Sequence, residues 1–118
     1  MHNRPLLLGA VAYDPKVVTI WEGFKEWFSR QGFRFDYALF SGYEAQAEAH
    51  LAGHVDVTWD SPLCWVRTRR LAAAQGRTAH SIAMRNTDQD LTSVVLVRAD
   101  GPIETVDQLA GRTVGVGA

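Results

Sequence analysis

The stretch His54–Leu63 joins a short strand directly to the start of a helix. Hydrophobic and polar residues alternate along Val55–Trp59, which is the period-two pattern of a strand. Asp60 or Ser61 can then cap a helix whose first residue is Pro62. At such a corner the free N–H groups of the first helical turn face outward at the carboxyl end of the strand, where open α/β sheets bind their ligands.

The same order of strand, polar corner and helix occurs twice before this stretch. Leu6–Ala12 is an uninterrupted hydrophobic run, typical of a strand covered on both faces, and Asp14 with Pro15 can begin a helix after it. Phe33–Phe40 predicts a second strand, and Ser41–Glu44 has the S-x-x-E form of a capping box. The helices are predicted to end at Gly32, Gly53 and Gly76.

Three strand–helix corners in one chain predict an α/β three-layer sandwich with a mostly parallel sheet. Right-handed crossovers keep parallel strands pointing one way, so the three corners are expected to converge at one edge of the sheet. Each corner carries an aromatic residue beside a small or polar one, and these aromatics are Tyr13, Tyr43 and Trp59.

The helical periodicity predicts which side chains face the core. In the first helix, core packing is predicted for Val17, Trp21, Phe24 and Phe28. An aromatic cage around a ligand is the weaker interpretation of these residues. In the helix from Pro62, the residues predicted to face inward are Leu63, Val66 and Leu71. Those predicted to face outward are Arg67, Arg69 and Arg70. A solvated helix surface explains these arginines more simply than a phosphate-binding face does.

Further elements are predicted after Gly76. Strands are expected over Thr78–Met84, Thr92–Arg98 and Thr113–Gly117, with a polar loop over Arg85–Asp90. Thr105 opens a second capping-box pattern before a short helix that Gly111 closes. A strand at the end of the chain, with no successor to pair with, is expected of a truncated sequence.

Composition narrows the function classes. A net charge of −1 gives no electrostatic reason to expect nucleic acid, and no apolar run is long enough to insert in a membrane. His50 and His54 have helical metal-ligand spacing, but Gly53 separates them and no third ligand follows, so neither a metal nor another cofactor is predicted. Cys64 has no convincing base near it in the sequence, which favours a small buried filler over a nucleophile.

Several of these motifs together resemble one protein family. They are V-A-Y-D-P at Val11–Pro15, Tyr43 in an alanine-rich helix, V-D-V-T-W-D-S-P-L at Val55–Leu63, V-V-L-V-R-A-D-G-P-I, and V-D-Q-L-A-G-R-T-V-G-V-G. The chain is similar to the phosphate, phosphite and phosphonate branch of the type II periplasmic binding proteins. The resemblance implies a first α/β lobe over residues 1–97, and a hinge crossing with the start of an incomplete second lobe over residues 98–118.

The resemblance also implies a function and a site. It implies the substrate-binding component of an ABC transporter for a small oxyanion, with a membrane permease as partner and no catalysis. The implied ligand-binding residues are Tyr13, Ser41, Tyr43, Trp59, Asp60 and Ser61. Phosphonate binders generally carry an uncharged residue where Asp60 stands. The carboxylate would suit an amino-bearing ligand, and the alternative is that Asp60 only caps the helix.

Two other function classes share this bilobal fold. One comprises enzymes of the menaquinone and thiamin-pyrimidine biosynthesis type, and the other comprises effector domains of transcription regulators. Nothing resembling a helix-turn-helix precedes Leu6, which counts against the regulator. The resemblance implies a periplasmic location, whereas a chain naturally starting at Met1 would be cytoplasmic, because no signal region precedes the first strand.

Overall fold

A computed structural model describes residues 4–116 of the chain. Its contacts divide the chain into two compact units, one ending at Ser81 and the other beginning at Ile82. Across the described residues, no helix has both the length and the apolar character needed to span a membrane. The first unit contains all the regular helices and strands that position the candidate site.

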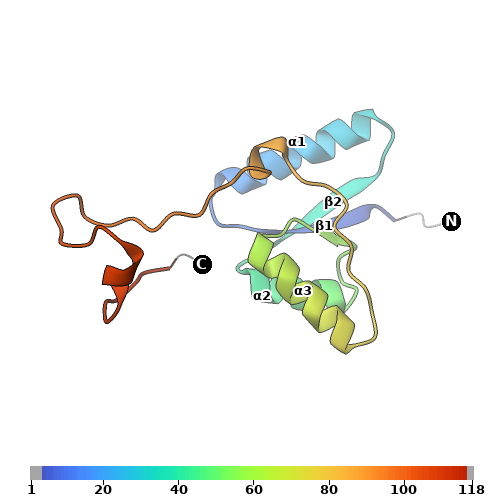
Figure 1. Cartoon of the computed structure of the whole chain (residues 1–118). Helices are drawn as coiled ribbons and strands as arrows, with labels where there is room; N and C mark the ends of the chain where they lie inside the picture. The colour runs from blue at the N-terminus through green and yellow to red at the C-terminus, as the bar shows by residue number, and fades with distance from the viewer. Residues whose placement is uncertain (1–3, 117–118) are drawn as a thin grey trace. The chain divides into compact units, whose positions relative to one another are not determined.

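A three-stranded parallel sheet forms the centre of the first unit. Strand β1 (Leu6–Val11) lies between β2 (Phe35–Phe40) and β3 (Val57–Thr58), so the strand order is β2-β1-β3 (Figure 1). β1 pairs with β2 along its full length, from Leu6 opposite Phe35 onward. The predicted parallel sheet is confirmed, although β3 is shorter than its sequence pattern suggested.

Helices cover both faces of this sheet, as the three-layer prediction requires. α1 (Lys16–Arg30) lies on one side, and α2 (Tyr43–Leu51) and α3 (Pro62–Ala74) lie together on the other (Figure 1). Each helix follows a strand across a short corner, and the corners before α1 and α3 supply a side-chain oxygen, from Asp14 and Ser61, to an N–H group of the first turn. The fold is therefore an α/β lobe with a parallel sheet between two helical layers.

The main hydrophobic core lies between α1 and the sheet. Its buried members are Ala10, Val17, Trp21 and Phe35. Phe28 packs against this cluster, with its ring centroid 4.8 Å from that of Phe35. Phe24 was also predicted to lie in the core, but 45% of its surface is exposed, because it lines an open hollow of α1 together with the exposed Ile20 and Trp27.

The opposite face of the sheet is packed with small side chains. α3 contributes Cys64, Thr68 and Ala72, which are four residues apart and therefore share one face of the helix. The prediction that Leu63, Val66 and Leu71 face inward is wrong, since they are 78%, 50% and 39% exposed. Small residues on α3 let it approach α2, whose buried residues are Gln46 and Ala47, and large leucines would hold the two helices apart.

Asp56 fixes the start of β1 beside β3. Its carboxylate accepts two hydrogen bonds from the Arg4 guanidinium, at 2.7 and 2.6 Å, and a third from the Leu7 backbone N–H at 2.9 Å. The Asp56 N–H in turn donates to the Leu7 carbonyl. Side-chain and backbone bonds thus set the register of β3, which has few ladder bonds of its own.

Gly9 lies in β1 at a point where the neighbouring strands leave little room for a side chain. A Cβ atom at this position would lie 3.1 Å from Phe40 Cε2 and 3.3 Å from Thr58 Cγ2. We expect Gly9→Val to lower the free energy of unfolding by about 1–3 kcal/mol through overpacking. Gly23 in α1 has no neighbour within 4 Å of such a Cβ, so Gly23→Ala should raise it by up to about 1 kcal/mol. Urea unfolding of both variants checks this, and equal destabilisation would contradict it.

The second unit contains two short 3₁₀ helices, Asn86–Asp88 and Val106–Leu109, and no strand within residues 82–116. The predicted strands over Thr78–Met84 and Thr92–Arg98 are therefore wrong. The predicted strand over Thr113–Gly117 is also wrong for residues 113–116, and its last residue, Gly117, lies outside the described residues. A strand needs a hydrogen-bonded neighbour and a buried face, and Leu96 is 87% exposed.

Two other predictions for this unit, a turn region and a capping box, are confirmed. The Arg85–Asp90 segment is a turn region, as predicted. The predicted capping box is confirmed, because Gln108 Oε1 accepts the Thr105 N–H at 3.0 Å.

Candidate functional site

The three strand–helix corners of the first unit form the candidate site. β1, β2 and β3 are parallel neighbours, so their carboxyl ends lie at one edge of the sheet, as predicted. The first turns of α1, α2 and α3 begin at this edge, and helix N-termini offer N–H groups to anions. Tyr13 follows β1, Ser41 and Tyr43 follow β2, and Trp59, Asp60 and Ser61 follow β3.

The structure brings Tyr43 together with the other two corners. Burial raises the pKa of the Tyr43 hydroxyl, and the nearby Cys64, Tyr13 and Asp60 raise it further. Tyr13 itself is 76% exposed, so its ring is free to meet a ligand from solvent. The two tyrosines thus present hydroxyl groups on neighbouring corners beside the Asp60 carboxylate.

Ser61 caps α3. Its backbone is extended, its Oγ accepts the Cys64 N–H at 3.2 Å, and Pro62 opens the helix as predicted. The interpretation of Asp60 as the cap is therefore wrong, because Ser61 occupies that position. Asp14 has the capping role at the first corner, where its Oδ1 accepts the Lys16 N–H at 2.8 Å.

The Asp60 carboxylate is instead held by α2 and α3. The Gln46 amide Nε2 donates to Asp60 Oδ1 at 2.8 Å and to the Trp59 carbonyl at 3.1 Å. The Cys64 thiol lies 3.5 Å from the same Asp60 oxygen. Sequence reasoning missed Gln46, which is completely buried. Its only signal was a polar residue between two alanines on the short helix after the second corner.

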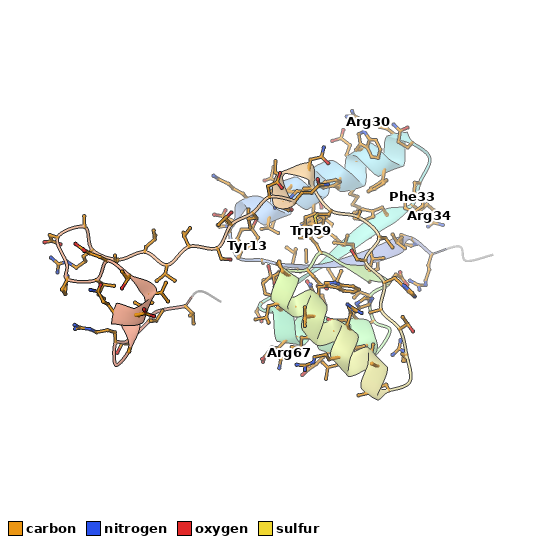
Figure 2. All side chains as sticks on the ribbon, viewed as in Figure 1. Tyr13, Arg30, Phe33, Arg34, Trp59 and Arg67 are labelled. Carbon is orange, nitrogen blue, oxygen red and sulfur yellow. The ribbon has the colours of Figure 1, made fainter. Side chains whose placement is uncertain are left out.

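The Trp59 side chain lies in the core rather than over the corner. Its ring contacts Trp21 edge-on, with the centroids 6.2 Å apart, and it packs against the cluster beneath α1. Figure 2 shows Trp59 beneath α1 and Tyr13 at the end of that helix. Because the indole is half-buried in the core, the main contribution of Trp59 at the corner is its backbone, which Gln46 holds.

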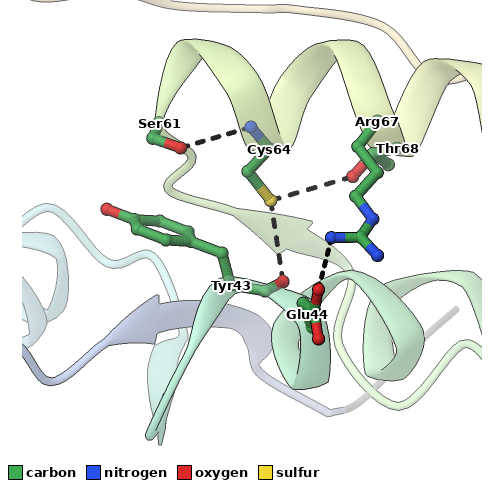
Figure 3. A network of polar contacts seen from close by, with 6 residues as sticks. All are labelled: Tyr43, Glu44, Ser61, Cys64, Arg67 and Thr68. Carbon is green, nitrogen blue, oxygen red and sulfur yellow. Dashed lines mark hydrogen bonds and ion pairs between the residues drawn. The ribbon is translucent and has the colours of Figure 1, made fainter. Parts of the chain in front are cut away.

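Ser41 does not cap α2. The N-cap is Gly42, and no side chain forms a cap hydrogen bond, so the predicted capping box at Ser41–Glu44 is wrong. Glu44 instead forms an ion pair with Arg67 at 2.6 Å, which links α2 to α3 (Figure 3). The Ser41 side chain is exposed at the corner and keeps its hydroxyl available.

Two of the three arginines predicted to face outward on α3 interact with neighbouring side chains. Arg67 pairs with Glu44, and the Arg69 guanidinium stacks over the Trp65 ring, 5.5 Å from its centroid. This agrees with the interpretation of a solvated surface.

Cys64 is a buried thiol between the starts of α2 and α3 (Figure 3). Besides Asp60, its sulfur lies 3.7 Å from the Tyr43 carbonyl and 4.0 Å from Thr68 Oγ1. Burial, and then the Asp60 charge, raise the pKa of Cys64 to about 11. The interpretation of Cys64 as a buried filler is confirmed, because a reactive cysteine needs a lowered pKa and an exposed sulfur.

The raised pKa of Cys64 predicts a stability change in alkali. The folded state holds this proton more tightly than the unfolded chain, so the stabilisation is complete below about pH 9 and is lost as the pH rises toward 11. Tyr37 and Tyr43, whose pKa values are also raised, add to the loss above pH 10. We expect Cys64→Ala to be less stable at pH 7 but to lose less stability between pH 9 and 10. Urea unfolding of both proteins at a series of pH values measures this. Equal losses of unfolding free energy between pH 9 and 10 would contradict the prediction.

Other features do not compete with the corners as a site. Within residues 4–116, no group of three His, Cys, Asp or Glu side chains is placed to hold a metal ion. His50 Nδ1 lies 3.3 Å from Thr58 Oγ1 and is thereby engaged in the fold. A shallow hollow of about 370 Å³ on α1 is lined by Ile20, Gly23, Phe24 and Trp27, none of which is a corner residue.

Comparison with known proteins identifies the family to which the sequence is similar. Residues 10–118 match the family model described as "ABC transporter, phosphonate, periplasmic substrate-binding protein". This match includes all three corners, the first unit from residue 10 onward, and the second unit. Neither the curated proteins nor the solved structures gave a match.

Proposed function

Because the chain belongs to the phosphonate-binding periplasmic substrate-binding proteins of ABC transporters, we propose that it binds a small phosphonate that also carries an amine. The family is a transport family and not an enzyme family, so the expected outcome of binding is delivery to a membrane permease. We further propose that residues 1–97 form the first of two lobes, with the crossing to the second lobe within residues 98–118.

The corner chemistry supports an oxyanion as one part of the ligand. Tyr13, Tyr43 and Ser41 present hydroxyl groups that can donate hydrogen bonds, and Ser61 can donate its hydroxyl hydrogen while its oxygen caps α3. The first turn of each helix adds backbone N–H groups and the positive end of the helix dipole. These donors suit the charged oxygens of a phosphonate.

The observation that carries the amine is the position of Asp60. A carboxylate facing an oxyanion opposes binding unless a positive charge lies between them. Asp60 does not cap the helix, and its Oδ1 is already held by Gln46 and Cys64. A ligand ammonium group could pair with this carboxylate while the phosphonate meets the hydroxyl and N–H donors.

Titrations of this chain test the proposal. We expect aminomethylphosphonate to bind more tightly than methylphosphonate, and methylamine to show no binding, because the oxyanion provides most of the contacts. One lobe leaves half of the ligand uncovered, so the dissociation constant of the 118-residue chain should be weaker than micromolar. NMR titration at millimolar ligand measures this range. Failure of both phosphonates to bind would contradict the proposed phosphonate-binding function. A dissociation constant in the micromolar range or below would contradict the two-lobe proposal.

A further inference from the structure

Gln46 is an unusual residue in the buried layer between α2 and the sheet edge. None of its surface is exposed, and it lies on α2 where the neighbouring buried position is an alanine. Buried polar side chains are generally hydrogen-bonded, because an unpaired one loses its hydration without compensation. Its contacts therefore indicate what it does.

Both amide hydrogens of Gln46 are directed at the third corner. Nε2 donates to the Trp59 carbonyl at 3.1 Å and to Asp60 Oδ1 at 2.8 Å, so two successive residues of the corner are held by one group. Reversing the amide would turn Oε1 toward a carbonyl and a carboxylate, which only accept hydrogen bonds. The orientation of the Gln46 side chain is thus set by the corner itself.

The opposite end of the amide shows that this arrangement has a cost. Oε1 of Gln46 is buried and has no hydrogen-bond partner. An unsatisfied buried acceptor is unfavourable, so packing alone would favour an apolar residue of the same size at this position. The two bonds to Trp59 and Asp60 are the only gain that glutamine offers in exchange.

Cys64 completes the support from the other helix. Its thiol approaches the same oxygen, Asp60 Oδ1, at 3.5 Å, which is closer than the Tyr43 carbonyl at 3.7 Å and Thr68 Oγ1 at 4.0 Å. Two donors from two helices therefore converge on Oδ1, and Oδ2 of Asp60 is not engaged by either. A carboxylate held in this way has one fixed orientation and one oxygen left for a ligand.

We propose that Gln46 is a positioning residue, which fixes the Asp60 carboxylate so that Oδ2 receives the ammonium group of the ligand, with Cys64 as the second support. This inference rests on the proposed function. It assigns the selectivity between the two ligands to the buried residues Gln46 and Cys64, which act on the ligand only through Asp60. Gln46 fixes the direction of the charge, and Asp60 provides the charge.

Three variants test this role in the 118-residue chain. Gln46→Met keeps the side-chain size and removes both donors, and Cys64→Ala removes the second donor. Thr68→Val is the matched control, because Thr68 is as buried as Gln46 and contacts Cys64 but not Asp60. The measured quantity is the ratio of the dissociation constants for methylphosphonate and aminomethylphosphonate, obtained by NMR titration.

We expect Gln46→Met to reduce this ratio by about fivefold or more, and Cys64→Ala to reduce it less, since a thiol is the weaker donor. Thr68→Val should lose stability and keep the ratio. An unchanged ratio in Gln46→Met, together with a reduced ratio in Asp60→Asn, would overturn the positioning role and leave the proposed function intact. Equal reductions in Gln46→Met and Thr68→Val would also overturn it, as a general effect of a damaged core.

A ligand-free measurement on chains that keep Gln46 covers the case in which Gln46→Met does not fold. Both Nε2 protons of Gln46 should exchange slowly with solvent, and both should shift when Asp60 is replaced by alanine. Rapid exchange, or no shift, would overturn the inference whether or not the chain binds phosphonates.

Discussion

Trp21→Ala should lower the free energy of unfolding by about 3–5 kcal/mol, which is the usual cost of truncating a buried tryptophan. Trp21 is 7% exposed and contacts Phe24 of α1, Phe35 of β2 and Trp59 of the third corner, so its removal leaves a cavity among these three rings. Because Trp59 leads directly into the third corner, phosphonate binding should weaken together with stability. Urea unfolding measures the first effect, and an NMR titration measures the second.

Trp27→Ala is the matched control for this prediction. Trp27 lies on the same helix but is 55% exposed, so its loss should change stability by less than about 1 kcal/mol and leave binding unaltered. Similar losses in the two variants would contradict the placement of the core between the inner face of α1 and the sheet.

Asp60→Asn should reverse the ligand preference of the chain. Without the negative charge, methylphosphonate should bind more tightly. Aminomethylphosphonate should lose about 1–3 kcal/mol, the scale of a hydrogen bond to a charged group. The asparagine carbonyl can still accept from Gln46 Nε2, so the corner should keep its shape. The measurement is a titration of both ligands against both proteins.

Asp14→Asn provides the control at the neighbouring corner. Asp14 caps α1, and asparagine is an equally good cap, so neither the stability nor the ligand preference should change much. If Asp60→Asn behaved in the same way as Asp14→Asn, the Asp60 carboxylate would have no role in selectivity.

The first 76 residues show why local patterns predicted much of this fold. An apolar strand, a polar cap and a helix stopped by glycine are each encoded by neighbouring residues, and Gly53 ends α2 with a φ of 79° as expected. The parallel direction of the strands followed from the crossover rule, whereas their order in the sheet, β2-β1-β3, was not predicted.

The errors arose where the answer depends on a distant partner. α3 packs through Cys64, Thr68 and Ala72 because α2 comes close to it, and the hydrophobicity of α3 alone favoured its leucines. The spacing of three small residues at four-residue intervals was the available signal. Thr92–Arg98 has a strand composition, but composition does not supply a neighbouring strand.

The candidate site was predicted in location but not in detail. The convergence of Tyr13, Tyr43 and Asp60 followed from topology. The division of roles between Asp60 and Ser61 did not, since either can cap a helix. Gln46 reaches Asp60 across 14 residues of sequence, a contact that no local pattern encodes.

The central claim is that the three corners together form a phosphonate receptor, and mapping the bound ligand on the chain tests it most directly. Backbone amide shifts in an NMR titration with aminomethylphosphonate should cluster at the first turns of α1, α2 and α3, with the largest changes around Tyr43, Ser61 and Cys64. The outer face of α1, around Ile20 and Trp27, should not respond. Shifts concentrated on that outer face, with the corner amides unmoved, would contradict the claim.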